Sequence, residues 1–403
     1  MRTCNLWILI ALLRRLSRDN LRQLQKRQRL AIACVHYLFY YRDMSSRNSK
    51  QRLIPKGRGV GSNPAIRFGQ QRTDPFDDGW DMVDDQNTLR TETSIERPRT
   101  AITRNSSPDL SFDRSVNPYR GCEHGCVYCY ARPSHAYLGL SPGLDFETKL
   151  VARPTISELL DKELRRSSYT PKTIAIGTNT DPYQPIERDQ KIMRRVLEIL
   201  SAFNHPVGIV TKGALITRDI DILAPMAAKG LVRVGVSITT LDDKTGRVME
   251  PRVPSAKAKL RVIRELSDAG IPVRIMVSPI IPALTDHELE TILEAAADAG
   301  AVAASSIVLR LPLEVATLFK DWLAEQFPDR AERVLGRVRE LHGGKDYDPS
   351  FGQRMTGQGK WAELIQQRFK LKTRQLGLDR SLPELRTDLF EVPLQTGDQL
   401  SLF

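Results

Sequence analysis

Six short apolar runs, each followed by a helical pattern, occupy most of the chain between residues 115 and 326. The predicted strands are Ser115–Tyr119, Thr173–Gly177, Val207–Thr211, Val232–Ile238, Val273–Val277 and Ser305–Leu309. The predicted helices are Ile156–Arg165, Gln190–Ala202, Thr217–Ala228, Ala256–Ala269, Asp286–Ala297 and Leu313–Gln326. Because strands that alternate with helices form a parallel sheet covered by those helices, the sequence predicts an α/β fold. The alternation by itself does not show whether the sheet closes into a barrel.

Three cysteines lie within eight residues, directly after the first predicted strand: Cys122, Cys126 and Cys129, with the spacing C-x3-C-x2-C. A 4Fe–4S cluster is normally held by four thiolates, one on each iron. A loop that supplies three thiolates therefore leaves one iron open to a further ligand. The other two cysteines, Cys4 and Cys34, lie far upstream in the N-terminal stretch, and we do not count them as ligands.

Two other interpretations of the cysteine loop need weighing. A disulfide framework is disfavoured, because the clustered cysteines are odd in number and the chain is too large to depend on cross-links. A structural zinc site usually takes two groups of ligands, and only one is present, although His124 or His135 could fill a fourth position. Gly121 and Gly125 favour the cluster, since glycines let the backbone bend tightly around a bulky core.

Polar residues follow the predicted strands at the end where barrel enzymes gather their functional side chains. They are Thr178, Asn179, Thr180 and Asp181 after the second strand, Lys212 after the third, Ser237 and Thr239 at the fourth, Ser278 and Pro279 after the fifth, and Arg310 after the sixth. The run after the second strand offers donors and acceptors to an amino-acid-like ligand, with an ordinary Asx turn as the alternative. Lys212 ends an apolar strand, and its alternative is a lysine that extends its ammonium into solvent.

The run NPYRGCEHGCVYCYAR, with Tyr128 just before the last cysteine, resembles the signature of the radical SAM superfamily. Within it, the chain is similar to the branch of spore photoproduct lyase and DNA-repair-photolyase-like proteins, from about residue 110 to about residue 312. The resemblance implies a partial (β/α)6 barrel of the radical SAM type, open on one side. It also implies that the open iron binds S-adenosylmethionine (SAM), and that reductive cleavage of SAM yields a 5′-deoxyadenosyl radical that abstracts hydrogen.

The resemblance also suggests which residues bind the cofactor. In the related lyases a lysine at the position of Lys212 faces the SAM carboxylate, a serine corresponds to Ser237, and the residue at Tyr128 contacts adenine through its backbone. Arg310 is a second candidate for the carboxylate. Together with the loop after the second strand, the expected cofactor-binding residues are Tyr128, Thr178, Asn179, Asp181, Lys212, Ser237 and Arg310. The resemblance assigns no catalytic residue, because the loop after the second strand lacks the cysteine with which those lyases return a hydrogen atom.

Charge and amino-acid composition divide the chain into segments. The formal net charge is +12, but residues 1–72 hold 16 Lys or Arg against two Asp, so the remainder, with 44 basic and 46 acidic residues, is close to neutral. We interpret residues 1–43 as a non-native extension, residues 44–111 as a polar, poorly ordered arm, residues 112–312 as the partial barrel and residues 313–403 as a helical C-terminal extension and tail. The alternative for the first segment is a basic amphipathic helix that rests on a surface. Its apolar runs are too short to span a bilayer, so no membrane partner is expected.

The sequence therefore predicts a cytoplasmic radical SAM enzyme of the lyase or transferase class, with one 4Fe–4S cluster, SAM and a reduced electron donor of the flavodoxin or ferredoxin type. A cytoplasmic location fits because cluster assembly needs reduced thiols. The substrate stays open, with nucleic acid among the candidates. One alternative is a nucleic-acid repair or modification enzyme that uses the basic residues 47–72 as a phosphate tether. A modifier of tRNA or of a peptide is equally compatible, and a non-catalytic iron–sulfur or zinc protein is the remaining alternative.

Overall fold

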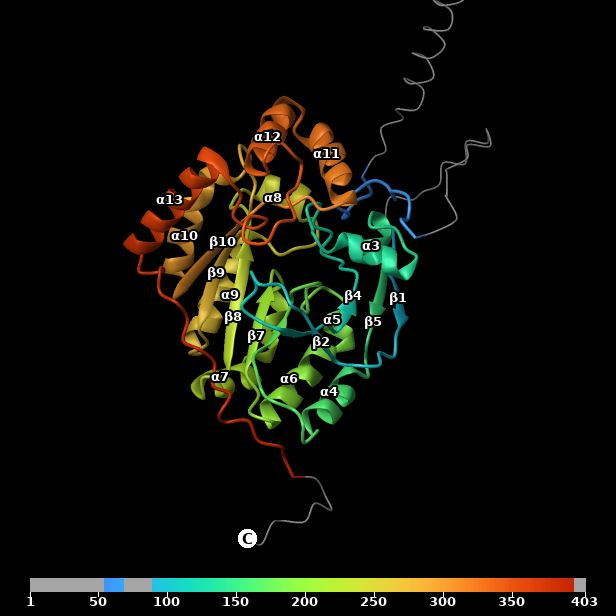
Figure 1. The fold of residues 1–403 in the computed structure, drawn as a ribbon, viewed down its shortest axis with the longest axis vertical. Helices are drawn as coiled ribbons and strands as arrows, with labels where there is room; N and C mark the ends of the chain where they lie inside the picture. The colour runs from blue at the N-terminus through green and yellow to red at the C-terminus, as the bar shows by residue number, and fades with distance from the viewer. Residues whose placement is uncertain (1–53, 69–88, 395–403) are drawn as a thin grey trace, which may run out of the picture. The chain divides into compact units, whose positions relative to one another are not determined.

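The computed structural model describes residues 54–68 and 89–394, which belong to one compact unit, Ile54–Phe403. Its main sheet has the strand order β10-β9-β8-β7-β6-β3-β2. These strands are β2 (Ile102–Arg104), β3 (Arg114–Val116), β6 (Ile174–Ile176), β7 (Val207–Thr211), β8 (Val232–Ile238), β9 (Val273–Ile280) and β10 (Ala303–Val308). From β3 to β10 neighbouring strands are parallel and follow chain order, whereas β2 is antiparallel to β3. The predicted α/β fold is confirmed, and the sheet is an open, partial barrel with edges at β10 and β2 (Figure 1).

Helices connect successive parallel strands, and most of them cover one face of the sheet, whereas one short helix after β8 lies beyond the C-terminal ends of the strands (Figure 1). They are α4 (Ile156–Leu164), α5 (Glu187–Gln190), α6 (Ile192–Ala202), α7 (Ile220–Ala228), α8 (Asp243–Met249), α9 (Ala256–Asp268) and α10 (Leu289–Asp298). The sequence of α9 shows why such a helix forms. Ser255 caps its first turn by accepting a backbone N–H, Val262 and Leu266 are buried on its apolar face, and the chain turns away at Gly270 with φ of 74°.

A second, smaller sheet has the order β1-β5-β4 and was not predicted. Its strands are β1 (Glu92–Ile95), β4 (Tyr119–Arg120) and β5 (Lys149–Ala152), with β5 parallel to β1 and antiparallel to β4. The single strand predicted over residues 115–119 is divided into β3 and β4, because Asn117 and Pro118 interrupt it and proline has no N–H for a ladder. As a result, β4 leads directly into the cysteine loop.

The segment predicted as a poorly ordered arm, residues 44–111, differs from that expectation where the structure describes it. Strand β1 is part of the smaller sheet, β2 is part of the main sheet, and Val60 is buried in the core. The backbone N–H groups of Ala101 and Ile102 donate to the carboxylate of Glu163 at 2.8 and 3.1 Å. Edge strands of this kind are held by backbone pairing, which a polar composition does not reveal. The predicted extension, residues 1–43, and residues 69–88 of the arm lie outside the described residues.

The C-terminal extension contains α11 (Glu314–Gln326), α12 (Pro328–Leu341) and α13 (Gly359–Gln375). Within the predicted helical extension, α13 packs against α10 (Figure 1). The free edge of β10 is covered by this extension, since the N–H of Val308 donates to Met355 O at 2.9 Å and the N–H of Ala304 donates to Leu378 O at 3.0 Å. The extension therefore protects one open edge of the partial barrel.

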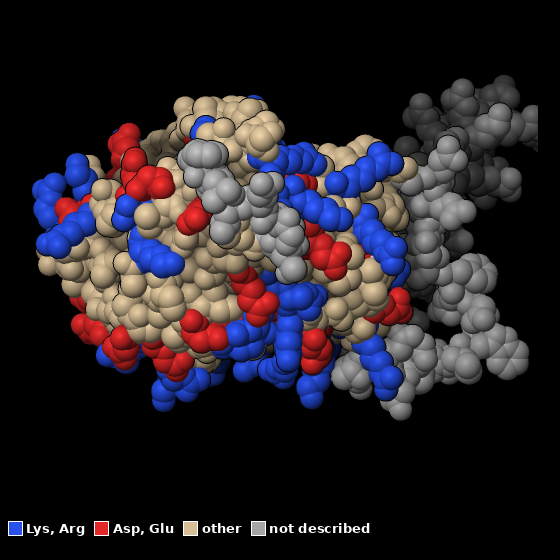
Figure 2. Space-filling view, turned by 90° about the horizontal axis from the view of Figure 1, so that it is seen from below, with Lys and Arg blue, Asp and Glu red and all other residues tan. Residues whose placement is uncertain are grey.

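The surface of the described unit carries charges of both signs. Figure 2 shows the face at the N-terminal ends of the parallel strands, where Lys and Arg side chains lie beside Asp and Glu. This mixture agrees with the near-neutral charge of the chain after residue 72. In the described ranges, no helix combines the length and apolar character needed to cross a membrane.

Candidate active site

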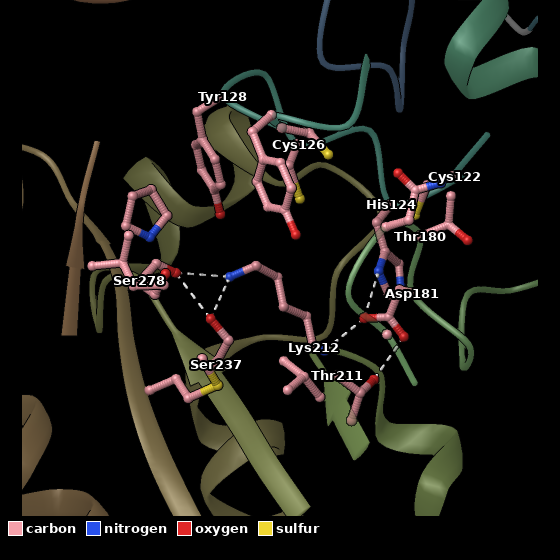
Figure 3. Close-up of a pocket in the computed structure, with 18 of the residues that line it drawn as sticks. Cys122, His124, Cys126, Tyr128, Thr180, Asp181, Thr211, Lys212, Ser237 and Ser278 are labelled. Carbon is pink, nitrogen blue, oxygen red and sulfur yellow. Dashed lines mark hydrogen bonds and ion pairs between the residues drawn. The ribbon is translucent and has the colours of Figure 1, made fainter. Parts of the chain in front are cut away.

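The cysteine loop follows β4 and bends at two glycines. Gly121 and Gly125 have φ of 73° and 67°, a left-handed conformation that other residues rarely adopt. The three thiols are free and line one cavity; Cys122 and Cys126 are 6% and 8% exposed, and Cys129 is half-buried. Figure 3 shows Cys122 and Cys126 on the wall of this cavity. Burial raises the pKa of each of these thiols, so a metal that binds there must displace their protons.

A buried ion pair supports the cysteine loop from behind. Arg132, at the start of η1 (Arg132–Leu138), donates to Cys126 O at 3.0 Å and to Gly125 O at 3.2 Å, and its guanidinium pairs with Glu147 of α3 (Leu144–Thr148). Both side chains are fully buried. Burial raises the pKa of Glu147, although Arg132 acts in the opposite direction. Charge-assisted hydrogen bonds from Arg132 thereby hold the carbonyls of the loop in place.

The N-terminal segment completes this support. Gly59 N donates to the Glu147 carboxylate at 2.9 Å, and the Arg58 guanidinium donates to Glu147 O at 2.8 Å. A Cβ on Gly59 would lie 1.7 Å from Gly125 O, so only glycine fits against the cysteine loop. Residues that the sequence placed in a loose arm thus form part of the wall behind the site.

Lys212 lies at the centre of a buried polar cluster at the C-terminal ends of β7, β8 and β9. Its ammonium donates to Ser237 Oγ at 2.9 Å and to Ser278 O at 3.1 Å, as Figure 3 shows, and pairs with the Glu250 carboxylate at 3.1 Å. Lys259 pairs with the other oxygen of Glu250, also at 3.1 Å.

Glu250 collects further donors in this cluster. Tyr128 Oη and Thr239 Oγ1 both donate to its carboxylate, the second at 2.8 Å. Burial alone would raise the pKa of Glu250, but Lys212 and Lys259 hold it well below its ordinary value. The tyrosine that was expected to act through its backbone therefore also uses its side chain to hold this carboxylate.

The loop after β6 brings Asp181 to the lining of the same cavity and also ties it to neighbouring elements. The Asp181 carboxylate accepts from Thr211 Oγ1 and from Lys212 N, each at 2.7 Å, and lies 3.4 Å from His124 Nδ1 (Figure 3). Burial would raise the pKa of Asp181, whereas His124 and these donors lower it overall. Its described contacts make Asp181 a positioning group that ties the cysteine loop to the end of β7.

The other residues of that loop separate into two groups. Asn179 and Thr180 line the cavity, and Thr180 Oγ1 donates to Tyr119 O at 3.0 Å. Thr178 does not line it; its carbonyl accepts from Tyr130 Oη. The loop therefore presents Asn179 to the cavity more directly than Thr178.

Arg310 lines the cavity from the end of β10. Its guanidinium lies over the ring of Tyr130, 4.8 Å from the centroid, and its Nε is buried with no hydrogen-bond partner among the described residues. A buried donor that lacks a partner is costly unless a ligand supplies an acceptor. Arg310 is thus equipped to receive an anionic group in the cavity.

Zinc is the alternative metal for the cysteine loop, with His124 or His135 as a fourth ligand. Within the described ranges, no three side chains of His, Cys, Asp or Glu come close enough together to hold one metal ion. His135, one candidate for a fourth zinc ligand, lies 3.0 Å from Lys149 O through Nε2, and burial lowers its pKa to about 4.

Comparison with known proteins identifies the family. Residues 116–296 match the model of the radical SAM superfamily. An uncharacterised protein of Mycobacterium tuberculosis is 38% identical over 242 residues, which cover 60% of this chain and 70% of that protein. An uncharacterised protein of Methanocaldococcus jannaschii is 27% identical over 173 residues, 43% of this chain and 62% of that protein. The chain belongs to the radical SAM superfamily.

Solved structures agree with this assignment at the level of the fold. A mutant of spore photoproduct lyase matches with a TM-score of 0.53 and 16% identity, over 70% of this chain and 79% of that one. Spore photoproduct lyase in complex with dinucleoside spore photoproduct matches with a TM-score of 0.52 and 16% identity, over the same shares of both chains. At this identity the likeness shows a shared fold and does not transfer the substrate. The resemblance inferred from the cysteine motif is confirmed.

Proposed function

We propose that this radical SAM enzyme, of the lyase or transferase class, holds a 4Fe–4S cluster on Cys122, Cys126 and Cys129 and binds SAM in the same cavity. The observation that carries the proposal is the convergence of three free thiols, two of them buried and one half-buried, with Lys212 and Arg310 at the C-terminal edge of the parallel sheet. When both are bound, the cluster and SAM supply a 5′-deoxyadenosyl radical that abstracts hydrogen from the substrate.

The cationic side chains of the cavity are suited to the SAM carboxylate. Lys212 and Lys259 share one carboxylate, that of Glu250, so the three groups carry a formal net charge of +1 beside the cavity. Arg310 adds an unpaired Nε on the side of β10. A carboxylate that enters the cavity gains charge-assisted hydrogen bonds from these groups, and Ser237 and Asn179 lie within the same lining.

The remaining residues orient the site and limit its exposure to water. Tyr128 is 7% exposed and fixes Glu250, and Asp181 fixes His124 and the end of β7. Exclusion of water and of stray partners protects a reactive radical from side reactions. We further propose a cytoplasmic location and an electron donor of the flavodoxin or ferredoxin type, because the thiols must stay reduced.

Nucleic-acid repair or modification is the second candidate function. Its support is the shared fold with spore photoproduct lyase, a structure of which holds a dinucleoside lesion. The basic tether expected from residues 47–72 gains less support, since Arg58 is buried and bonded to Glu147, and Arg67 pairs with Glu314.

Anaerobic reconstitution tests the proposed function before any substrate is known. The protein should bind about four irons per chain and, with SAM and dithionite, release 5′-deoxyadenosine. Cys126→Ala should lose the iron, whereas Cys34→Ala, a matched control at a cysteine not counted as a ligand, should retain it. Stoichiometric zinc without iron after expression in iron-rich medium would contradict the cluster. An intact cluster that yields no 5′-deoxyadenosine would favour a non-catalytic iron–sulfur protein.

A further inference from the structure

The inner face of the sheet carries a second set of charged residues below the active site. Side chains alternate between the two faces of a strand, and the register pairs Gly208 of β7 with Arg233 of β8, and Gly235 of β8 with Arg274 of β9. The face of β8 that presents Ser237 to the active-site cavity therefore also presents Arg233, four residues closer to the N-terminal end of the strand. Arg274 lies on the same face of β9.

These arginines line a cavity that adjoins the active site. Its lining includes Gly208, Val210, Arg233, Gly235, Arg274 and Met276, and the active-site cavity shares Val210 and Met276 with it. Gly208 leaves room in this lining, because a Cβ there would meet only Arg233 Nε and a methyl group of Thr173, each at 3.8 Å, whereas Gly235 packs closely against Met276. No acidic side chain belongs to the described lining.

The two positive charges are not neutralised by the protein. The described lining holds no carboxylate beside Arg233 or Arg274, and among the described residues Arg274 Nε is buried without a hydrogen-bond partner. On the neighbouring strand, Ser305 pairs in register with Met276, and its Oγ is also buried without a partner. Two like charges with unsatisfied donors are unfavourable on folding, and an anionic ligand would remove this cost.

The spacing suits a single oxyanion group. Arg274 is paired in register with Gly235, two residues after Arg233, so the two Cα atoms lie about 8 Å apart, given a rise of about 3.3 Å per residue and about 4.8 Å between strands. Two long guanidinium side chains at this spacing can converge on one phosphate. Along β8, Arg233 precedes Ser237 by about 13 Å of strand.

We infer that Arg233 and Arg274 form an oxyanion subsite that binds a phosphate group of the substrate, at the base of the barrel and beneath the SAM-binding cavity. The inference rests on the proposed function, because it places the reacting C–H bond of the same molecule in the cavity above. The substrate is then a phosphate-bearing compound whose reactive carbon lies several bonds from its phosphate.

Phosphate binding can be measured on the full chain without the cluster. Equilibrium dialysis with radiolabelled inorganic phosphate should give saturable binding that weakens about tenfold or more in R233Q/R274Q, since two charge-assisted contacts are lost. R261Q/R264Q, which changes two exposed arginines of α9, is the matched control and should bind within about twofold of the unchanged protein. Equal affinity in the unchanged protein and in R233Q/R274Q overturns the subsite.

A second variant keeps the test valid if R233Q/R274Q does not fold. Gly208 lies opposite Arg233, with its Cβ position 3.8 Å from Arg233 Nε, so Gly208→Asp would place an internal carboxylate beside that guanidinium. This variant should bind phosphate at least about tenfold more weakly and should not unfold at a lower temperature. Undiminished phosphate binding by Gly208→Asp also overturns the subsite.

Two further measurements complete the test. The first identifies the kind of compound that carries the phosphate, and the second distinguishes failure of the subsite from failure of the proposed function. A nucleoside 5′-monophosphate that binds more tightly than inorganic phosphate, and only with the two arginines present, supports a nucleotide substrate; equal binding supports a phosphate compound of another kind. Reconstituted R233Q/R274Q should keep its iron and its substrate-free formation of 5′-deoxyadenosine. If the unchanged protein forms none but still binds phosphate through these arginines, the proposed function fails and the subsite stands.

Discussion

Replacing Glu250 by Gln removes one negative charge from between two buried ammonium groups while keeping the shape of the side chain. Each ammonium lies 3.1 Å from a carboxylate oxygen, which corresponds to an attraction of about 5 kcal/mol per pair at an effective dielectric constant of about 20. Most of that attraction is offset by desolvation of the charges. The measured cost of breaking a buried pair is about 3–5 kcal/mol, and we expect Glu250→Gln to lower the free energy of unfolding by that amount.

The same reasoning predicts a partial rescue. Lys259 is 3% exposed and Lys212 is 15% exposed, so Lys259 is the side chain left without a counter-charge or water. Adding Lys259→Met to Glu250→Gln should therefore restore about 2 kcal/mol, since the uncompensated buried charge is removed. The assay is urea unfolding of the cluster-free protein at pH 7, followed by circular dichroism.

The matched control is Glu340→Gln, which breaks an exposed pair with Arg337 on α12. Its effect should stay within about 0.5 kcal/mol, as for other surface pairs. The charge argument is refuted if Glu250→Gln costs no more than this control, or if the double variant loses the sum of the two single losses. A change in the slope of the unfolding transition would instead indicate a change in the unfolded state.

Three other outcomes can be checked. Lys212→Ala should weaken SAM binding by about 1.5–3 kcal/mol while the iron content is retained, as measured by calorimetry on reconstituted protein; unchanged affinity would transfer this role to Arg310. Burial lowers the pKa of His205 from 6.5 to about 4. As the pH falls, the unfolded state therefore binds a proton before the folded state does. The free energy of unfolding should keep its full value above pH 6.5 and fall by up to about 3 kcal/mol as the pH drops toward 4. Urea unfolding should show a shallower pH dependence for His205→Gln, and an identical dependence would refute this assignment. Incubation with the dinucleotide spore photoproduct and dithionite should yield no multiple-turnover repair to thymines, because the loop 178–181 offers hydroxyls and no thiol as hydrogen donor; repair with turnover would restore the lyase reaction.

The alternation of strands and helices along the sequence predicted both the parallel sheet and the meeting of the site residues at one edge of it. Apolar strands such as Val207–Thr211 and Val232–Ile238 alternate with helices, and the C-terminal ends of parallel strands meet at one edge. The order of strands and helices along the chain was therefore enough to place Lys212 and Ser237 together with the cysteine loop.

The residues that support the site were not predictable in this way. Glu250 follows the short helix α8, where neither hydrophobic periodicity nor a motif distinguishes it from a surface residue. It comes close to Lys212 only when the chain is folded. Arg132 and Glu147 pair behind the loop, and a charged residue in a polar run is usually solvated. The one available signal for Gly59 was the glycine-rich run around it, which composition assigned to an arm.

Residues 54–68 and 89–111 contribute to the folded unit, so the smallest portion of this chain that can be expressed as a folded protein should begin before them. The match to the superfamily model begins at residue 116, yet a fragment that begins at residue 112 would lack β2 and would expose β3 as an unprotected edge, open to pairing between molecules. It would also lack Gly59 and Arg58, so the carboxylate that anchors Arg132 would lose its backbone donor and the cysteine loop would lose its rear wall. Truncation near the motif would therefore yield an aggregation-prone fragment with a weakened metal-binding loop, and its failure to take up iron would say nothing about the chemistry of the intact enzyme.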